Sequence, residues 1–280
     1  MLSDLLYGRT HHRPFWPVAE RHRAPVQNGA RVNQTIPLGA FVEKLARHRA
    51  LDARERKALL DLPHAVKTVR RHDYLIREDE QAQNCCVILS GFAVRHKATR
   101  SGARQIFSIH MAGDGVDLSN SQLGQADHNI QMLSAGDVAF IPVDAIRAVT
   151  FAWPATCQAM WYDSLLDGAI FREWTLNVGR RDALSRMAHM LCEFALRLDE
   201  AGLGVREGYE LPMTQEELAD ALGLTTIHVN RTLKALAKEK LIVRTSRSVE
   251  ICDWPRLAII GDFDSGYLHL DRATPNLAAT

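Results

Sequence analysis

The feature that most constrains the fold is a pair of short helical patterns separated by one glycine near the C-terminal end of the chain. Thr214 is followed three residues later by Glu217, the spacing of a capping box at a helix start. That helix is expected to end at Gly223, because glycine adopts the left-handed conformation of a helix C-terminus at low cost. Thr225 can then cap a second helix that begins at Thr226. Two helices joined by so short a turn must cross steeply.

The second helix has an apolar stripe of Val229, Leu233 and Leu236, which leaves its other faces polar. Residues 225–250 contain six basic side chains against two acidic ones, a local net charge of +4. Such a face suits the major groove of DNA, whereas the acidic first helix would lie away from the phosphates. We expect the DNA contacts to come from Thr225, Thr226, Ile227, His228, Asn230, Arg231, Lys234, Arg244 and Arg247.

A β-hairpin is predicted after the second helix. Apolar residues at 241–243 and 249–251 flank a polar turn over 245–248. A hairpin in this place is typical of a winged helix-turn-helix, in which arginines of the wing contact phosphate. Two alternatives stay open, namely two packed helices without a DNA function and a winged module that binds another protein.

Composition places few other limits on the chain. Its 280 residues are 46% hydrophobic and 24% charged, which is ordinary for globular protein and long enough for two domains. No run reaches the roughly 18 to 20 apolar residues of a membrane helix, and no secretory signal is evident, so a cytoplasmic protein is expected. Five cysteines without regular spacing argue against a disulfide framework. The pair His11 and His12, in an N-terminal stretch rich in arginine, lacks companion metal ligands.

From residue 65 to residue 142 the pattern changes to short stretches of β-branched and aromatic residues separated by glycine-containing turns. This predicts a β-roll of roughly eight strands, preceded by two short helices. Cys85 and Cys86 fall within one expected strand, where we expect buried thiols that play a structural role. Oxidation of this pair is the alternative.

A helical pattern without proline runs from Ala155 past Arg180, well beyond the ~10 to 14 residues of an average helix. Four apolar residues spaced near four or seven would form a seam against a second copy: Leu165, Ala169, Leu176 and Ala183. Packing of this helix against its own β-roll is the alternative. The chain is therefore divided into a mobile basic extension (1–35), a β-roll domain (36–153), dimerisation and connecting helices (154–200), a winged helix-turn-helix (207–270) and a tail (271–280).

This order of parts resembles the CRP/FNR superfamily of bacterial transcription regulators. The motifs that carry the resemblance are CVILSGFAVRHK and GARQIFSIHMAGD in the roll, RMAHMLCEFALRL in the connecting helix and LPMTQEELADALGLTTIHVNRTLKAL in the reading head. The resemblance implies an α+β fold with a cyclic-nucleotide-binding-like jelly roll, a homodimer on a two-fold symmetric operator, and contact with RNA polymerase. No enzymatic activity is expected, since no nucleophile elbow, phosphate loop or zinc-binding helix is present, and His96, His110 and His128 stand alone.

Two departures from the family pattern bear on the effector. Members that bind cyclic AMP carry Gly-Glu for the ribose and Arg-Ser or Arg-Thr for the phosphate, and the aligned positions here are Asp117 with Leu118 and Ala126 with Asp127. A carboxylate in place of a guanidinium repels phosphate, so cyclic AMP is not the expected ligand. A cyclic-nucleotide-responsive regulator with a remodelled pocket is the alternative. Oxygen-sensing members carry N-terminal cysteines for an iron–sulfur cluster, and residues 1–84 contain none, so no cofactor is predicted and the effector is unknown.

The reading helix departs as well. Where cyclic AMP receptors present Arg-Glu-x-x-x-Arg to the bases, this chain has Thr226, Ile227 and Arg231. Arg231 can still bond guanine in bidentate fashion, which discriminates between bases by about 1 to 3 kcal/mol. The half-site is therefore expected to differ from that of the cyclic AMP receptors at the base pairs that their glutamate contacts.

Overall fold

The computed structural model describes residues 36–245 and 247–270, and the expected basic extension and tail lie outside the described residues. Two short helices come first, α1 (Gly39–His48) and α2 (Ala53–Leu60). Helix α2 begins with a capping box, because the Asp52 carboxylate accepts from the backbone N–H of Glu55 and the Glu55 carboxylate accepts from that of Asp52. The two helices that were predicted before the roll are therefore present.

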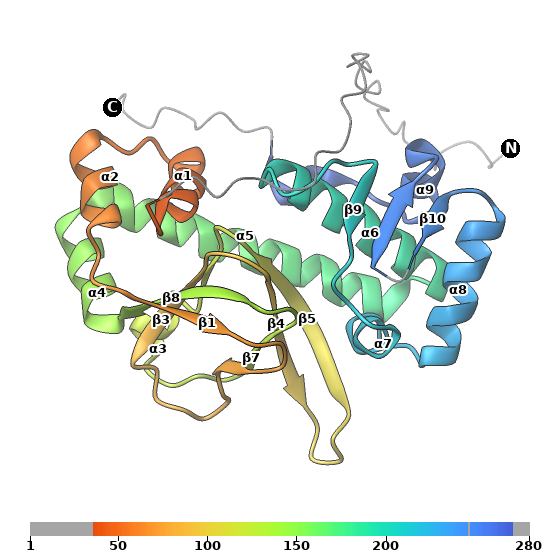
Figure 1. The fold of residues 1–280 in the computed structure, drawn as a ribbon, viewed down its shortest axis with the longest axis horizontal. Helices are drawn as coiled ribbons and strands as arrows, with labels where there is room; N and C mark the ends of the chain where they lie inside the picture. The colour runs from red at the N-terminus through yellow and green to blue at the C-terminus, as the bar shows by residue number, and fades with distance from the viewer. Residues whose placement is uncertain (1–35, 246, 271–280) are drawn as a thin grey trace, which may run out of the picture. The chain divides into compact units, whose positions relative to one another are not determined.

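The β-roll consists of two four-stranded antiparallel sheets, one in the order β1-β8-β3-β6 and the other in the order β2-β7-β4-β5 (Figure 1). Three of the strands, β2, β6 and β7, were not predicted individually, because runs of two to four residues carry too little periodicity. The elements are β1 (Ala65–Val69), β2 (Tyr74–Ile76), β3 (Asn84–Ile88), β4 (Phe92–Ala98), β5 (Arg104–Met111), β6 (Gly115–Val116), α3 (Asn120–Leu123), β7 (Asn129–Met132) and β8 (Gly136–Pro142).

Strand β3 lies between β8 and β6 in its sheet, and both of its faces are buried. Cys85 and Val87 pack into the apolar cluster shared with α1 and with the helix that follows β8, whereas Cys86 and Ile88 belong to the cluster inside the roll. This alternation is the period of two that a strand imposes. Burial, reinforced by the nearby Asp117 carboxylate, raises the pKa of the Cys85 thiol to about 12. Both thiols are therefore buried structural groups.

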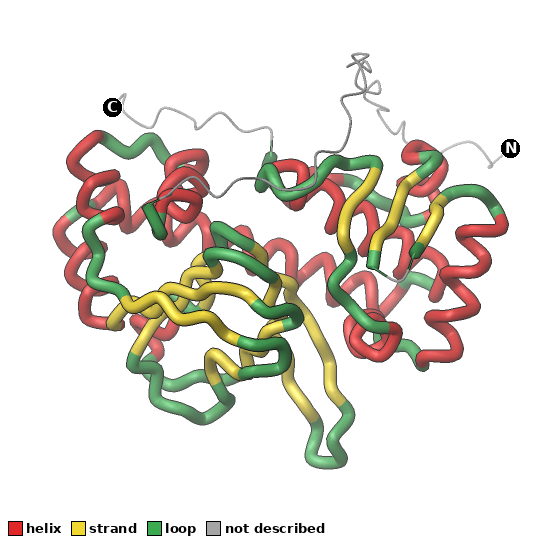
Figure 2. The backbone as a smooth tube through the Cα atoms, in the orientation of Figure 1, coloured by secondary structure: helices red, strands yellow, loops and turns green. Residues whose placement is uncertain are grey.

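A long helix follows the roll. Helix α4 (Val143–Ala152) leads into α5 (Pro154–Arg180), which has 27 residues and runs beside the strands in Figure 2. It stops where Arg181 adopts an extended conformation, and Asp182 then caps α6 (Ala183–Glu200) by accepting from the backbone N–H of Leu184 and of Ser185, both at 2.9 Å. The apolar pattern continues across this break.

The expected seam on α5 needs two corrections. Ala183 is the first residue of α6 and does not continue α5, because the Asp182 cap starts a new helix there. Ala169 is buried within its own chain, so it is not available at the surface of α5. Leu165 and Leu176 are exposed as expected, at 54% and 45%, and the other exposed large apolar residues of α5 are Trp161 at 66% and Phe171 at 49%.

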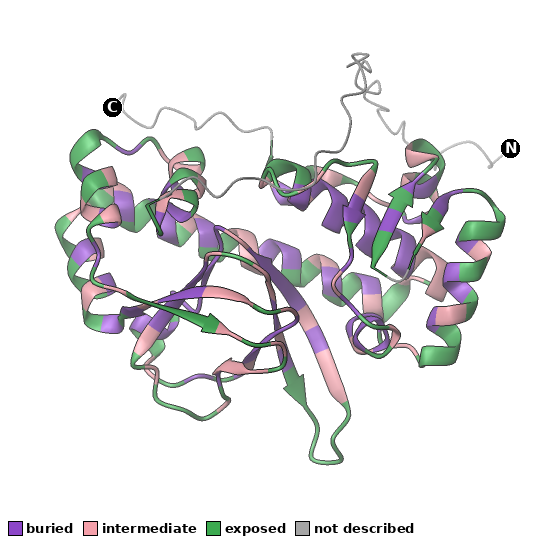
Figure 3. Cartoon of the chain, in the orientation of Figure 1, coloured by how far each residue is buried: buried purple, intermediate pink, exposed green. Residues whose placement is uncertain are grey.

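The winged module contains a three-stranded sheet in the order β10-β11-β9, together with helices that pack against α6. Strand β9 was not predicted and adds an edge to the expected hairpin. The largest apolar core joins α6, this module and residues of β4 and β5, and Figure 3 shows α6 as mostly buried. The elements are β9 (Gly208–Glu210), α7 (Gln215–Leu222), α8 (Thr226–Lys238), β10 (Ile242–Arg244), β11 (Ser248–Ile251), α9 (Trp254–Ile260) and η1 (Ser265–Leu268).

Among the residues that the structure describes, no helix combines the length and the apolar character that crossing a membrane requires.

Candidate nucleic-acid interface

The two helices and the turn of the reading head form as predicted. The Thr214 hydroxyl accepts from the backbone N–H of Glu217 at 3.1 Å, and the Glu217 carboxylate accepts from that of Thr214 at 2.7 Å. Gly223 ends α7 with φ 61° and ψ 40°, the left-handed conformation. A Cβ at Gly223 would also lie 3.0 Å from the Val178 side chain, so glycine is favoured for both reasons. The Thr225 hydroxyl then accepts from the backbone N–H of His228 and caps α8.

Helix α8 buries one face and presents the other. Val229, Leu233 and Leu236 are buried in the core, as the stripe predicted. Asn230 and Arg244 are half-buried, and the Asn230 amide donates to the Gln215 side chain at 3.4 Å. The remaining expected contact residues are exposed: Thr225, Thr226, Ile227, His228, Arg231, Lys234 and Arg247. The reading face is therefore accessible.

Two of the three acidic side chains of α7 are paired with the roll, and the third, Glu216, is exposed. Glu217 is paired with Arg71 at 2.7 Å, and Asp220 is paired with Arg104 at 2.7 Å. These pairs neutralise two carboxylates of the helix that precedes α8. The sequence did not reveal either pair, since the partners are more than 100 positions apart.

A second candidate site is a cavity of about 790 Å³ in the roll, bounded by β4, β5, the segment from β6 to α3, and α5. Three of the four residues expected at an effector pocket, Asp117, Leu118 and Asp127, line this cavity, whereas Ala126 is buried and does not. Asp117 has φ 59°, an uncommon conformation for a residue other than glycine and one that often marks a functional position.

A histidine occupies the acidic part of the cavity. The His128 Nε2 atom lies 2.7 Å from Asp117 Oδ1, and its Nδ1 atom lies next to Asp127 Oδ1. Arg95 Nη2 approaches the same Asp117 oxygen at 3.5 Å. The hydrogen bond with His128 holds the pKa of Asp127 below its usual value. One oxygen of each carboxylate is therefore bonded within the chain, whereas the buried Asp117 Oδ2 atom has no hydrogen-bond partner. An incoming phosphate would meet both carboxylates.

Sequence reasoning missed His128 and Arg95. The available signal was the pair of adjacent residues Asp127 and His128 in the segment that corresponds to the phosphate site. Among the described residues, no group of three or more histidine, cysteine or carboxylate side chains has an arrangement that could hold a metal ion.

Comparisons with known proteins match both the roll and the reading head. Residues 66–151 match the family model of the cyclic nucleotide-binding domain, and residues 185–260 match that of the Crp-like helix-turn-helix domain. The chain is similar to the transcriptional activatory protein AadR of Rhodopseudomonas palustris, with 30% identity over 64% of this chain and 74% of AadR. It is also similar to the transcriptional activator protein FnrL of Cereibacter sphaeroides, with 27% identity over 75% of this chain and 87% of FnrL.

The fold has solved counterparts. The structure of FixK2 from Bradyrhizobium japonicum matches with a TM-score of 0.64 at 22% identity, over 76% of this chain and all of that one. At this identity the match shows the fold alone, namely a cyclic-nucleotide-binding roll, a long helix and a winged helix-turn-helix. Together with the two family models and the 30% identical relative, it shows that the chain belongs to the CRP/FNR family of DNA-binding transcription regulators.

Proposed function

We propose that this regulator works as a homodimer that reads a two-fold symmetric operator through α8, and that its roll does not bind cyclic AMP. The observation that carries the proposal is the exposed basic face of α8, beside an α7 whose Glu217 and Asp220 are paired with the roll. Thr226 and Ile227 would contact bases or thymine methyl groups, and Arg231 would bond guanine. Arg244 and Arg247 of the wing would contact phosphates.

Selection of bound sequences from random DNA tests this proposal directly. The expected result is a palindromic consensus recovered by the purified protein at moderate ionic strength, unchanged by added cyclic AMP. Recovery of no enriched sequence would refute DNA reading and would favour a winged module that binds protein. Since family members contact RNA polymerase, the same operators in a transcription assay would reveal activation or repression.

The second copy is proposed to pack along α5. Trp161, Leu165 and Leu176 form an outward apolar stripe of a kind that a soluble monomer rarely leaves open on one long helix. Their spacings of four and eleven residues keep them near one side of the helix, as a helix pair requires. Replacing Leu165 and Leu176 by aspartate should convert the dimer to a monomer in sedimentation. Leu123→Asp, at a leucine outside α5 that is even more exposed, is the control and should leave the dimer intact.

Exclusion of cyclic AMP is proposed from the charge of the cavity. Asp127 stands near the position where an arginine would meet the phosphate, and His128 bridges it to Asp117. Calorimetric titration of the protein with cyclic AMP should show no saturable heat. The charge-reversed variant Asp127→Arg should gain measurable affinity, since it replaces a repulsion with a charge-assisted hydrogen bond. Saturable binding by the unaltered protein would refute the exclusion and support a remodelled nucleotide pocket.

A further inference from the structure

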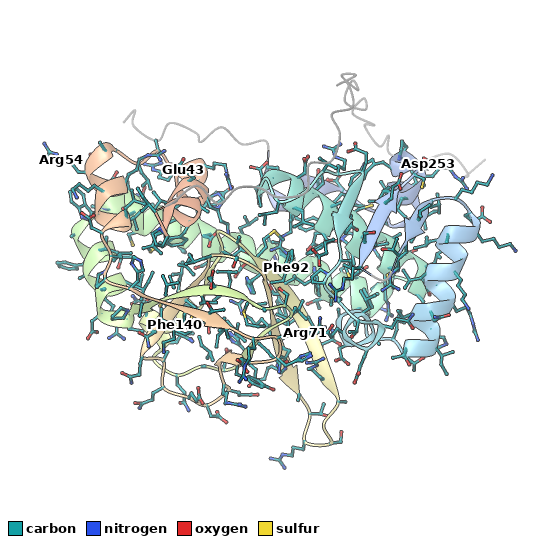
Figure 4. The ribbon with its side chains drawn as sticks, in the orientation of Figure 1. Glu43, Arg54, Arg71, Phe92, Phe140 and Asp253 are labelled. Atoms are coloured by element: carbon teal, nitrogen blue, oxygen red, sulfur yellow. The ribbon has the colours of Figure 1, made fainter. Side chains whose placement is uncertain are left out.

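The face of α7 that carries Glu217 and Asp220 is held by the roll through three side chains. Arg71, in the turn after β1, donates through Nη2 to both carboxylate oxygens of Glu217, at 2.9 and 2.7 Å (Figure 4). Arg104, the first residue of β5, donates through Nε to Asp220 at 2.7 Å. Gln105 donates to the Ala221 carbonyl at 3.1 Å. These six residues are called the latch below.

The latch is anchored firmly on the roll side. Arg104 also donates from Nη1 to the Gln131 side chain at 3.0 Å, and the Gln131 amide donates to the His72 carbonyl at 2.9 Å. Glu217 is buried, and its carboxylate also caps the first turn of α7. Both bonds to Glu217 come from the single Arg71 Nη2 nitrogen, and they are charge-assisted, which makes them stronger than hydrogen bonds between neutral groups. Motion of α7 away from the roll would therefore leave a buried carboxylate without its cation.

The position of α7 determines where α8 lies. The two helices pack against each other across Gly223, and the Arg186 guanidinium of α6 donates to the Leu222 carbonyl at 2.9 Å. In the proposed dimer the two-fold axis follows α5, so the pose of α7 on the roll sets the distance between the two copies of α8. Successive major grooves on one side of DNA are about 34 to 36 Å apart, and only one such distance fits a given operator.

We propose that Arg71 and Arg104 are positioning residues for half-site spacing, which hold the two reading helices at one separation without any effector. This inference rests on the proposed function. A dimer with a fixed separation binds both half-sites at once, so the second contact occurs at high effective concentration. If the two reading heads can move relative to each other, each head still contacts its half-site, but the increase in affinity that comes from binding both half-sites at once is lost. The side chains themselves do not touch DNA in this role.

The test compares the unaltered full-length protein with the double variant Arg71→Ala, Arg104→Ala. Binding is measured on three kinds of DNA duplex: the selected operator, operators whose spacer is changed by about one or two base pairs, and a single half-site. The double variant is expected to bind the operator about 10- to 100-fold more weakly. Its affinity for the single half-site should match that of the unaltered protein, which also shows that the reading head is folded. Its preference among spacers should flatten.

Two further tests distinguish an effect of Arg71 and Arg104 on the position of α7 from an effect of their positive charge on DNA binding. Arg100→Ala removes a cation from the exposed β4–β5 turn without touching α7, and should leave both affinity and spacer preference unchanged. Arg104→Asp alone sets two carboxylates against each other, and addition of Asp220→Arg should restore the spacer preference at unchanged net charge.

The proposal is overturned if the double variant keeps the original spacer preference, or if it binds the operator more tightly, which would make the latch inhibitory. An equal loss on the half-site and on the operator would also overturn it, since that indicates a charge effect. If the unaltered protein shows no preference for paired half-sites, the proposed function as a dimer on a symmetric operator is refuted. This result can be distinguished from the results that refute only the positioning role of Arg71 and Arg104.

Discussion

Replacement of Lys44 by methionine should destabilise the protein by about 3 kcal/mol at neutral pH. The Lys44 ammonium lies 2.9 Å from Asp114 Oδ1 and 2.7 Å from Asp163 Oδ1, and so joins α1 to the turn after β5 and to α5. All three side chains are largely buried, at 18%, 9% and 6% exposure. Methionine keeps the apolar stem of lysine, so the expected loss is electrostatic.

The magnitude follows from the partners that remain. Asp114 still accepts from the Met111 backbone N–H at 3.0 Å and lies 3.6 Å from Arg197. Asp163 is left with His48 alone, at 3.3 Å. Breaking a buried ion pair costs about 3 to 5 kcal/mol, and since one of the two carboxylates keeps a cation, the lower end applies.

The loss should depend on pH in a definite direction. Burial alone would raise the pKa of Asp163, but Lys44 and the His48 hydrogen bond hold that pKa below its usual value. A carboxyl group with a depressed folded pKa stabilises the fold above its unfolded pKa of about 3.9, and that contribution disappears as the pH falls through the folded value. Without Lys44 the buried Asp163 titrates at higher pH. The difference in the free energy of unfolding between the Lys44 variant and the unaltered protein should therefore be largest near neutral pH and should decrease as the pH falls.

Urea unfolding monitored by circular dichroism, in a pH series from about 8 down to about 4, measures both effects. Lys57→Met is the matched control, because Lys57 is exposed on α2 and its pair with Asp61 is solvated. That variant should change stability by no more than about 0.5 kcal/mol. A Lys44 variant as stable as this control at neutral pH, or a loss that grows on acidification, would refute the reasoning.

Four more outcomes are expected. Arg231→Ala should relax base choice at one position of each half-site by about 1 to 3 kcal/mol in competition binding, while Arg247→Ala should weaken all DNA alike and reduce the salt slope by about one. Gly223→Ala should cost about 1 to 2 kcal/mol in thermal unfolding, because its φ of 61° is unfavourable for alanine. Tyr267→Phe should cost about 1.5 to 3 kcal/mol in urea unfolding, since the Tyr267 hydroxyl donates to the buried Glu193 carboxylate at 2.7 Å.

The reading head could be predicted because its signals are local. Capping at Thr214, the left-handed Gly223 and the stripe of Val229 and Leu236 each depend on residues within one or two turns of helix. The order of roll, long helix and winged module also follows from changes of period along the chain.

The rest depends on residues brought together by the fold. The bridge from His128 to Asp117 and the pair of Arg71 with Glu217 join positions that no periodicity relates. A separate helix was expected over 184–198, and α6 begins one residue earlier, at Ala183. Ala183 was therefore assigned to the wrong helix, because the apolar pattern continues through the Asp182 cap. Strand β9 has only three residues, which is too short for its alternating pattern to be recognised in the sequence.

Strand β9 limits how reading heads can be exchanged between regulators. It pairs with β11 along Gly208 to Glu210, and the backbone N–H of Ile251 donates to the Glu207 carbonyl at 2.7 Å. The segment that leads into the reading head, residues 207–210, is thus part of the β-sheet of the wing. A chimaera spliced just before α7 would graft a wing that lacks its outer strand, so a working junction belongs upstream of residue 207.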